Sequence, residues 1–157
     1  RVFLENPAMQ PDLEAFDYVV GRQLRPTARK DVVEWLAAAG VTPHAMIDVS
    51  DGLASEVWHI CEASGVGAHV YQDKLPIDYQ TVQVAEAFDV PVTSLALFGG
   101  EDYELLFCAG QEHYEALRTC AAVHIIGYMT ETPGVRLVLP DDSMTDLQPG
   151  GYNHFGG

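Results

Sequence analysis

Two carboxylates and a hydroxyl group crowd together in the stretch MIDVSDGL, which contains Asp48, Ser50 and Asp51. In an extended strand the side chains alternate, so Asp48 and Ser50 share one face while their apolar neighbours face the core. Neighbouring carboxylates repel unless a cation or a proton lies between them. Oxygen-only ligands favour Mg²⁺, which takes one or two carboxylates together with waters and phosphates. Ser50 or Asp51 is also expected to cap the next helix, but a cap alone leaves Asp48 without a role.

A second cluster of acids follows a pair of glycines in FGGEDYELLF, residues 98–107. Adjacent glycines indicate a backbone that approaches another group closely or takes a positive φ. Glu101 and Asp102 then either meet a ligand or are solvated acids beside a glycine bulge, and the residue types favour neither reading. A third motif, PGGYNHFGG near the end of the chain, places Tyr152 among glycines. Its aromatic ring could stack on a planar heterocycle, or the segment could be a frayed terminus.

The basic residues gather in RQLRPTARK, residues 22–30, within a strongly acidic chain of net charge −15. Arg25 or Arg29 could bind an anion, and the alternative is a solvated basic loop. The acidic balance argues against nucleic-acid binding, which needs clustered Lys and Arg to neutralise phosphates. A protein of this charge that handles phosphates is expected to bridge them with divalent cations.

The elements that must position these residues follow from the hydrophobic pattern of one 157-residue domain. Helices are expected at about 12–24, 29–39, 52–64, 78–88 and 111–122, and strands at 45–49, 67–72, 103–109, 124–130 and 135–140. Gly40 and Gly65 are expected to end the second and third helices. The tail from residue 141 onward is expected to be a loop. Helices and strands mix without strict alternation, which predicts an α+β fold with a mixed sheet and helices on its faces.

The sequence also excludes several classes of protein. No apolar run approaches the roughly 20 residues needed to cross a bilayer, and no signal pattern opens the chain.

The absence of an initiator Met predicts that the chain begins inside a longer polypeptide. Three widely spaced cysteines indicate reduced core thiols in a cytoplasmic protein. Neither GxxxxGK[ST] nor GxGxxG occurs, so these common Gly-rich cradles do not hold ATP within this chain.

The motifs AMIDVSDGLASEV, ALFGGEDYELLF and GYNHF, in this order, resemble the C-terminal half of bacterial thiamine-monophosphate kinases. The upstream LRPTAR and the later IIGYMT support the resemblance, which covers nearly the whole chain. These kinases belong to the superfamily of aminoimidazole ribonucleotide synthetase. The resemblance implies a layered α/β/α C-terminal domain of a two-domain enzyme, whose N-terminal domain is absent from residues 1–157. It also implies a homodimer for the full-length protein.

The activity implied by the resemblance is transfer of the ATP γ-phosphoryl group to thiamine monophosphate, giving thiamine diphosphate. Asp48 and Asp51 would be ligands of Mg²⁺, of which several ions take part, and Ser50 would contact ATP. Glu101 would bind the thiamine moiety, and Tyr152 would pack against it. No side chain is expected to act as a nucleophile, since phosphoryl transfer depends on positioning and charge neutralisation.

Two alternatives to this function remain open from the sequence. The first is another ATP-dependent enzyme of the same superfamily, a selenophosphate or purine-intermediate synthetase. The second is a non-catalytic domain that binds a nucleotide or regulates a partner. Under the main interpretation the chain alone is expected to be inactive, because much of the metal cage would lie in the absent half.

Overall fold

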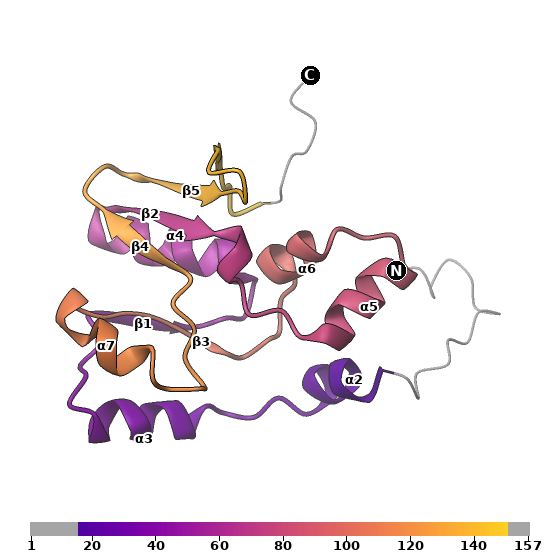
Figure 1. Ribbon diagram of the computed structural model, residues 1–157, viewed down its shortest axis with the longest axis horizontal. Coiled ribbons are helices and arrows are strands. Elements are labelled where there is room, and N and C mark those ends of the chain that lie inside the picture. The colour runs from indigo at the N-terminus through magenta and orange to yellow at the C-terminus, as the bar shows by residue number, and fades with distance from the viewer. Residues whose placement is uncertain (1–15, 151–157) are drawn as a thin grey trace.

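The computed structural model describes residues 16–150, which form helices packed around two β-sheets (Figure 1). The α-helices are α2 (Asp17–Leu24), α3 (Lys30–Ala38), α4 (Leu53–Ser64), α5 (Tyr79–Ala87), α6 (Val92–Phe98) and α7 (Tyr114–Leu117). The strands are β1 (Ala45–Asp48), β2 (Gly67–Tyr71), β3 (Leu105–Cys108), β4 (Gly127–Thr130), β5 (Gly134–Val138) and β6 (Met144–Asp146). No helix in this part of the chain is long and apolar enough to cross a membrane.

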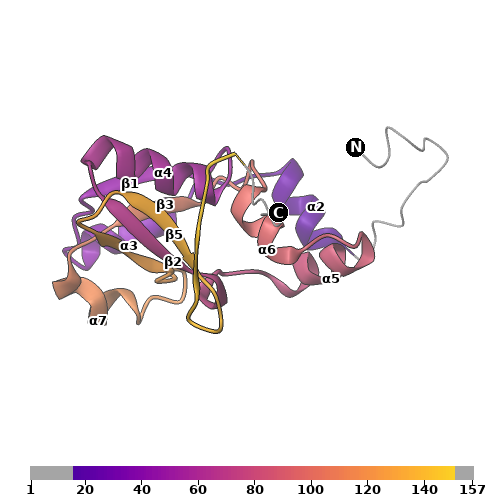
Figure 2. The same ribbon diagram turned by 90° about the horizontal axis from the view of Figure 1, so that it is seen from above.

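The strands divide between a small antiparallel sheet and a larger mixed one. Strands β1 and β3 pair alone, with Ile47 opposite Leu106. The other four run in the order β4-β2-β5-β6, with β2 parallel to β5 and the remaining pairs antiparallel. Figure 2 shows α4 on one side of the strands and α7 on the other. The predicted α+β fold with a mixed sheet and layered helices is therefore confirmed, although the strands form two sheets.

Helix α4 lies at the centre of the larger hydrophobic cluster. Its Val57 and Cys61 pack with Val70 of β2, Leu97 of α6 and Leu137 of β5, all nearly inaccessible to solvent. Apolar residues recur along α4 at helical spacing, so one face of the helix becomes buried. Gly65 then ends the helix at φ 68°, the left-handed conformation that glycine adopts at low cost. The predicted helix and its glycine stop are both confirmed.

A second, smaller hydrophobic cluster joins α3 to α7 and β3. Val32 and Leu36 of α3 are buried with Val41 and with Leu117 of α7. Phe107 of β3 packs against the same group. This cluster anchors α3 beneath the β1–β3 pair.

Strands β4 and β5 follow each other in the sequence but lie on opposite sides of β2. The segment that joins them crosses the start of β2 at Gly67. A Cβ atom at Gly67 would lie 2.1 Å from the carbonyl oxygen of Thr132 and 2.5 Å from that of Gly134. Residue 67 therefore has to be glycine for the crossing chain to lie this close.

In three segments the structure differs from the prediction. The segment after Asp142, expected to be a loop, forms β6 and buries Leu147 completely, with the Trp58 indole N–H donating to its carbonyl oxygen. Residues 111–122 form a short 3₁₀ turn and only the four-residue α7, because the chain turns back at Thr119. The segment from Val92 to Phe98 forms α6, which the sequence analysis did not predict.

Candidate functional site

Main-chain hydrogen bonds hold the two acidic motifs side by side. The N–H of Glu101 donates to the carbonyl oxygen of Ser50 at 2.7 Å, and that of Tyr103 donates to Val49 at 2.9 Å. In return, the Val49 N–H donates to the carbonyl oxygen of Glu104 at 2.8 Å. These bonds extend the β1–β3 pairing beyond Asp48, so residues fifty positions apart in the sequence become neighbours.

Two glycines permit this close approach. A Cβ atom at Gly100 would lie 2.6 Å from the carbonyl oxygen of Ser50. Gly52 takes φ 113°, and a Cβ there would lie 3.0 Å from the carbonyl oxygen of Leu97. Gly100, directly before Glu101, thus allows close backbone contact, one of the two roles that the sequence suggested for the glycine pair.

The side chains of the first motif alternate as predicted. Val49 is 5% exposed and belongs to the interior, whereas Asp48 and Asp51 are exposed and Ser50 is half-buried. Glu101 is also exposed, with φ 67° in the left-handed region. The candidate ligand side chains therefore lie at the surface, where a ligand can reach them.

The expectation that Ser50 or Asp51 caps α4 is wrong. The N-cap position is Gly52, and no side chain accepts a hydrogen bond there. The buried Glu56 instead turns back, and its Oε1 accepts the main-chain N–H of Asp51 at 3.1 Å. Because Glu56 supports the turn, the carboxylate of Asp51 and the hydroxyl of Ser50 are not used as caps.

Asp48 and Asp51 would supply only part of a metal site. Among residues 16–150, no three His, Cys, Asp or Glu side chains gather into a group that could hold a metal ion. Exposed carboxylates suit Mg²⁺, which commonly binds one or two of them and completes its octahedron with waters and phosphates. The donor chemistry thus fits Mg²⁺ if further ligands come from outside this part of the chain.

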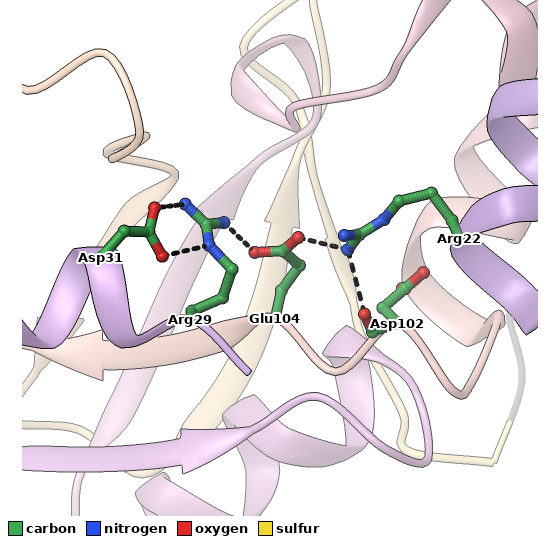
Figure 3. A network of polar contacts seen from close by, with 5 residues as sticks. All are labelled: Arg22, Arg29, Asp31, Asp102 and Glu104. Atoms are coloured by element: carbon green, nitrogen blue, oxygen red, sulfur yellow. Dashed lines mark hydrogen bonds and ion pairs between the residues drawn. The ribbon is translucent and has the colours of Figure 1, made fainter. Parts of the chain in front are cut away.

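A chain of ion pairs connects the basic segment to the second motif (Figure 3). Each carboxylate oxygen of Glu104 binds a different arginine, Arg22 or Arg29. Arg22 also donates to the carbonyl oxygen of Asp102 at 3.1 Å. At the other end, Arg29 holds Asp31 through two bonds of 3.0 and 2.9 Å. Figure 3 shows all these groups in one row, with Glu104 between the two guanidinium groups.

The network shifts the pKa values of Arg29 and Asp31. Hydrogen bonds to Asp31, together with the nearby Glu104, raise the pKa of Arg29. The same hydrogen bonds from Arg29 hold the pKa of Asp31 below its ordinary value. Arg29 and Asp31 are therefore both charged at neutral pH.

The sequence pattern does not predict these ion pairs. Arg29 forms ion pairs with Glu104 and Asp31, so its charge is already neutralised and it is not available to bind an anion. Because these pairs fix its side chain, the alternative of a solvated basic loop is also wrong for Arg29. Arg25 is exposed and makes no ion pair with residues 16–150. The available signal was the opposite charge of RQLRPTARK and GGEDYE, but charge alone does not specify which side chains meet.

A cleft of about 1330 Å³ is lined by residues of both sheets and of α7. Glu101, Asp102 and Glu104 border this cleft. The cleft lining includes Val49 but not Asp48, Ser50 or Asp51. The structure therefore joins the two motifs through their backbones, and the acids of the second motif border the cleft. Tyr152 lies outside the described residues.

Comparison with known proteins gives the class of this chain. Residues 6–140 match the family described as AIR synthase related protein, C-terminal domain, and the chain belongs to that family. Its curated relatives are thiamine-monophosphate kinases. The enzyme of Bacillus subtilis is 35% identical over 160 residues, which cover 98% of this chain and 47% of the relative.

Solved structures agree with this assignment. The structure of AaThiL complexed with AMPPCP and TMP matches with a TM-score of 0.74 and 30% identity, over 98% of this chain and 46% of that chain. The thiamine-monophosphate kinase of Stenotrophomonas maltophilia matches with a TM-score of 0.71 and 32% identity, over 87% and 44%. The chain spans about half the length of the relatives it matches.

Proposed function

We propose that residues 1–157 are the C-terminal domain of a two-domain, ATP-dependent thiamine-monophosphate kinase. The reaction transfers the γ-phosphoryl group of ATP to the phosphate of thiamine monophosphate, which gives ADP and thiamine diphosphate. The observation that carries the proposal is the main-chain ladder between Ser50 and Glu101, in a chain whose relatives are these kinases. These main-chain hydrogen bonds hold the motif with Asp48 and Asp51, which suits phosphates, beside the motif with Glu101, which suits the second substrate.

In this proposal each candidate residue has one role. Asp48 and Asp51 hold Mg²⁺, and the exposed position of both carboxylates supports this role. The ions neutralise the charge that accumulates between the two phosphate groups. Ser50 contacts ATP, Glu101 binds the thiamine moiety, and Tyr152 packs against that moiety.

No side chain of this chain has to act as a nucleophile. The acceptor is the substrate phosphate, which is already ionised at neutral pH. The protein orients the two substrates, and the remaining metal ligands belong to an N-terminal domain. The full-length enzyme is a homodimer in the cytoplasm, and the 157-residue chain alone does not turn over.

Substitution of the first motif tests this function in the full-length protein. We expect Asp48→Asn and Asp51→Asn each to lower the rate of thiamine diphosphate formation by about 100-fold or more, since each removes an anionic ligand of the Mg²⁺ that would neutralise the phosphates. Glu131→Gln is the matched control, because Glu131 is an exposed acid far along the chain from both motifs. Its rate should equal that of the wild type.

Activity that survives both Asn substitutions, with an unchanged Mg²⁺ requirement, would show that this motif is not catalytic. The alternative of a non-catalytic nucleotide-binding domain would then hold. The chain alone gives a second measurement. Thiamine diphosphate formation by residues 1–157 at the rate of the full-length enzyme would contradict the two-domain proposal.

A further inference from the structure

Helix α2 is held in place by polar contacts rather than by a buried face. None of its residues from Asp17 to Leu24 is buried. The main-chain N–H of Tyr18 donates to Oε1 of Gln80 on α5 at 3.0 Å. The other polar contacts of this helix with distant parts of the described chain come from Arg22 and Gln23, and all of them end on residues 101–104.

Glu104 is the residue on which most of these contacts depend. Its two carboxylate oxygens bind Arg22 at the end of α2 and Arg29 before α3. Its main-chain oxygen accepts the N–H of Val49, which fixes the backbone of Glu104 to the first motif. The side chains of Arg29 and Glu104 are 20% and 37% exposed, so the protein partly shields this pair from water. One residue thus joins α2, the loop before α3 and both motifs.

The attachment of α2 to residues 101–104 affects the side chain of Glu101. With α2 in place, the side-chain amide of Gln23 donates to Oε2 of the Glu101 carboxylate. Within residues 16–150, the other oxygen of Glu101 has no hydrogen-bond partner, and the residue borders the cleft. An exposed glutamate loses considerable rotamer freedom when it binds a ligand, and a contact made beforehand lowers that entropic penalty.

We propose that Glu104 is a positioning residue: by binding Arg22 and Arg29 it holds α2 where Gln23 fixes the direction of the Glu101 carboxylate. The inference rests on the proposed function, which assigns Glu101 to the thiamine moiety. Glu104 touches neither substrate and acts only through Gln23. Its effect is therefore confined to the binding of thiamine monophosphate.

Steady-state kinetics of the full-length enzyme test the inference. Glu104→Gln keeps the size of the side chain but removes the charge that binds both arginines. We expect the KM for thiamine monophosphate to rise about tenfold, the factor associated with loss of one charge-assisted contact. The KM for ATP and kcat should stay within about twofold of wild type. Glu115→Gln, which breaks the exposed pair with Arg118, is the control and should change none of the three constants.

A double substitution shows whether Glu104 acts through Glu101. In a Glu101→Gln background, Glu104→Gln should raise the KM for thiamine monophosphate no further, because residues that act as a unit are not additive. Additive effects, or an equal rise in the KM for ATP, would overturn the inference. Gln23→Ala, which removes one exposed amide, should reproduce the change and covers the case in which Glu104→Gln does not fold.

The wild-type enzyme separates this inference from the proposed function. If it forms no thiamine diphosphate, the proposed function is wrong and the inference fails with it. If it is active and both Glu104→Gln and Gln23→Ala leave the KM for thiamine monophosphate unchanged, only the inference is wrong.

Discussion

The N–H of Glu101 and the carbonyl oxygen of Ser50 lie 2.7 Å apart and form a direct main-chain hydrogen bond. The two candidate ligand residues are therefore joined without the help of any side chain. A bond of this kind fixes the spacing of the motifs by backbone geometry alone. Its formation requires Gly100, because any larger residue there would meet the same carbonyl oxygen.

We expect Gly100→Ala to destabilise the domain and to separate the two motifs. The added Cβ would lie 2.6 Å from the carbonyl oxygen of Ser50, a main-chain atom that moves only if the ladder moves. Crowding of this kind in a packed region typically costs about 1–3 kcal/mol. Thermal unfolding of the 157-residue chain measures the change.

Gly21→Ala is the matched control for that substitution. Gly21 lies within α2, and a Cβ there would have no atom within 4 Å. Alanine is the better helix former, so this variant should be as stable as the wild type or up to about 1 kcal/mol more stable. Equal melting temperatures for Gly100→Ala and Gly21→Ala would contradict the contact between the motifs.

Leu147→Ala should strongly destabilise the chain. Leu147 is fully buried in the larger hydrophobic cluster, although it follows the last and shortest strand. Loss of a buried leucine side chain costs about 2–5 kcal/mol. Met144→Ala is the control, because Met144 of β6 is 49% exposed and should matter little. Similar denaturant midpoints for the two variants would show that the C-terminal segment does not pack on α4.

The contribution of Asp31 to stability should disappear in acid. Hydrogen bonds from Arg29 lower the pKa of Asp31 from its ordinary 3.8, so the folded state holds this proton less tightly than the unfolded state. The resulting stability is present above 3.8 and is lost as the pH falls through the folded-state pKa. Wild type should therefore melt above Asp31→Asn at pH 7, and the difference should vanish once the pH falls below the folded-state pKa of Asp31.

Glu34→Gln serves as the control for the pH series. Glu34 is exposed on the same helix and makes no ion pair with residues 16–150. Its melting temperature should follow that of the wild type throughout the titration. A difference between wild type and Asp31→Asn that persists in acid would mean that the ion pair with Arg29 is not its source.

Cys61 should resist alkylation until the protein unfolds. Its thiol is 2% exposed, and burial, with a smaller effect of nearby Cys108, raises its pKa. Because the thiolate is the reactive form, a higher pKa slows modification at any given pH. Mass spectrometry after iodoacetamide treatment should find Cys61 unmodified in the native chain and modified in denaturant. Equal labelling in both states would place this residue outside the core.

Local patterns predicted those parts of the fold that local chemistry determines. The spacing of apolar residues along α4 and the glycine at residue 65 were sufficient to locate this helix and its end. The alternation around Val49 correctly separated the buried from the exposed side chains of the first motif. All three cysteines are free, as their spacing indicated.

Non-local contacts account for what the sequence did not reveal. The N-cap prediction failed because Glu56 supports the turn before α4, a role visible only once its burial is known. β6 was missed because three residues carry no periodic signal and gain their order from pairing with β5. Glu104, the partner that Arg22 and Arg29 share, lies more than seventy positions from each of them, and only the folded backbone brings it between them.

The passage of the chain across Gly67 also constrains the order in which the domain can form. β4 and β5 are neighbours in sequence, yet they cannot close on each other as a hairpin, because β2 lies between them. Strand β2 can therefore pair only after β4 and β5, about sixty positions later in the chain, have been synthesised. Pairings this distant fold slowly. On the ribosome β2 therefore lacks both neighbouring strands until the chain has emerged as far as β4, and lacks the second until Val138 has emerged.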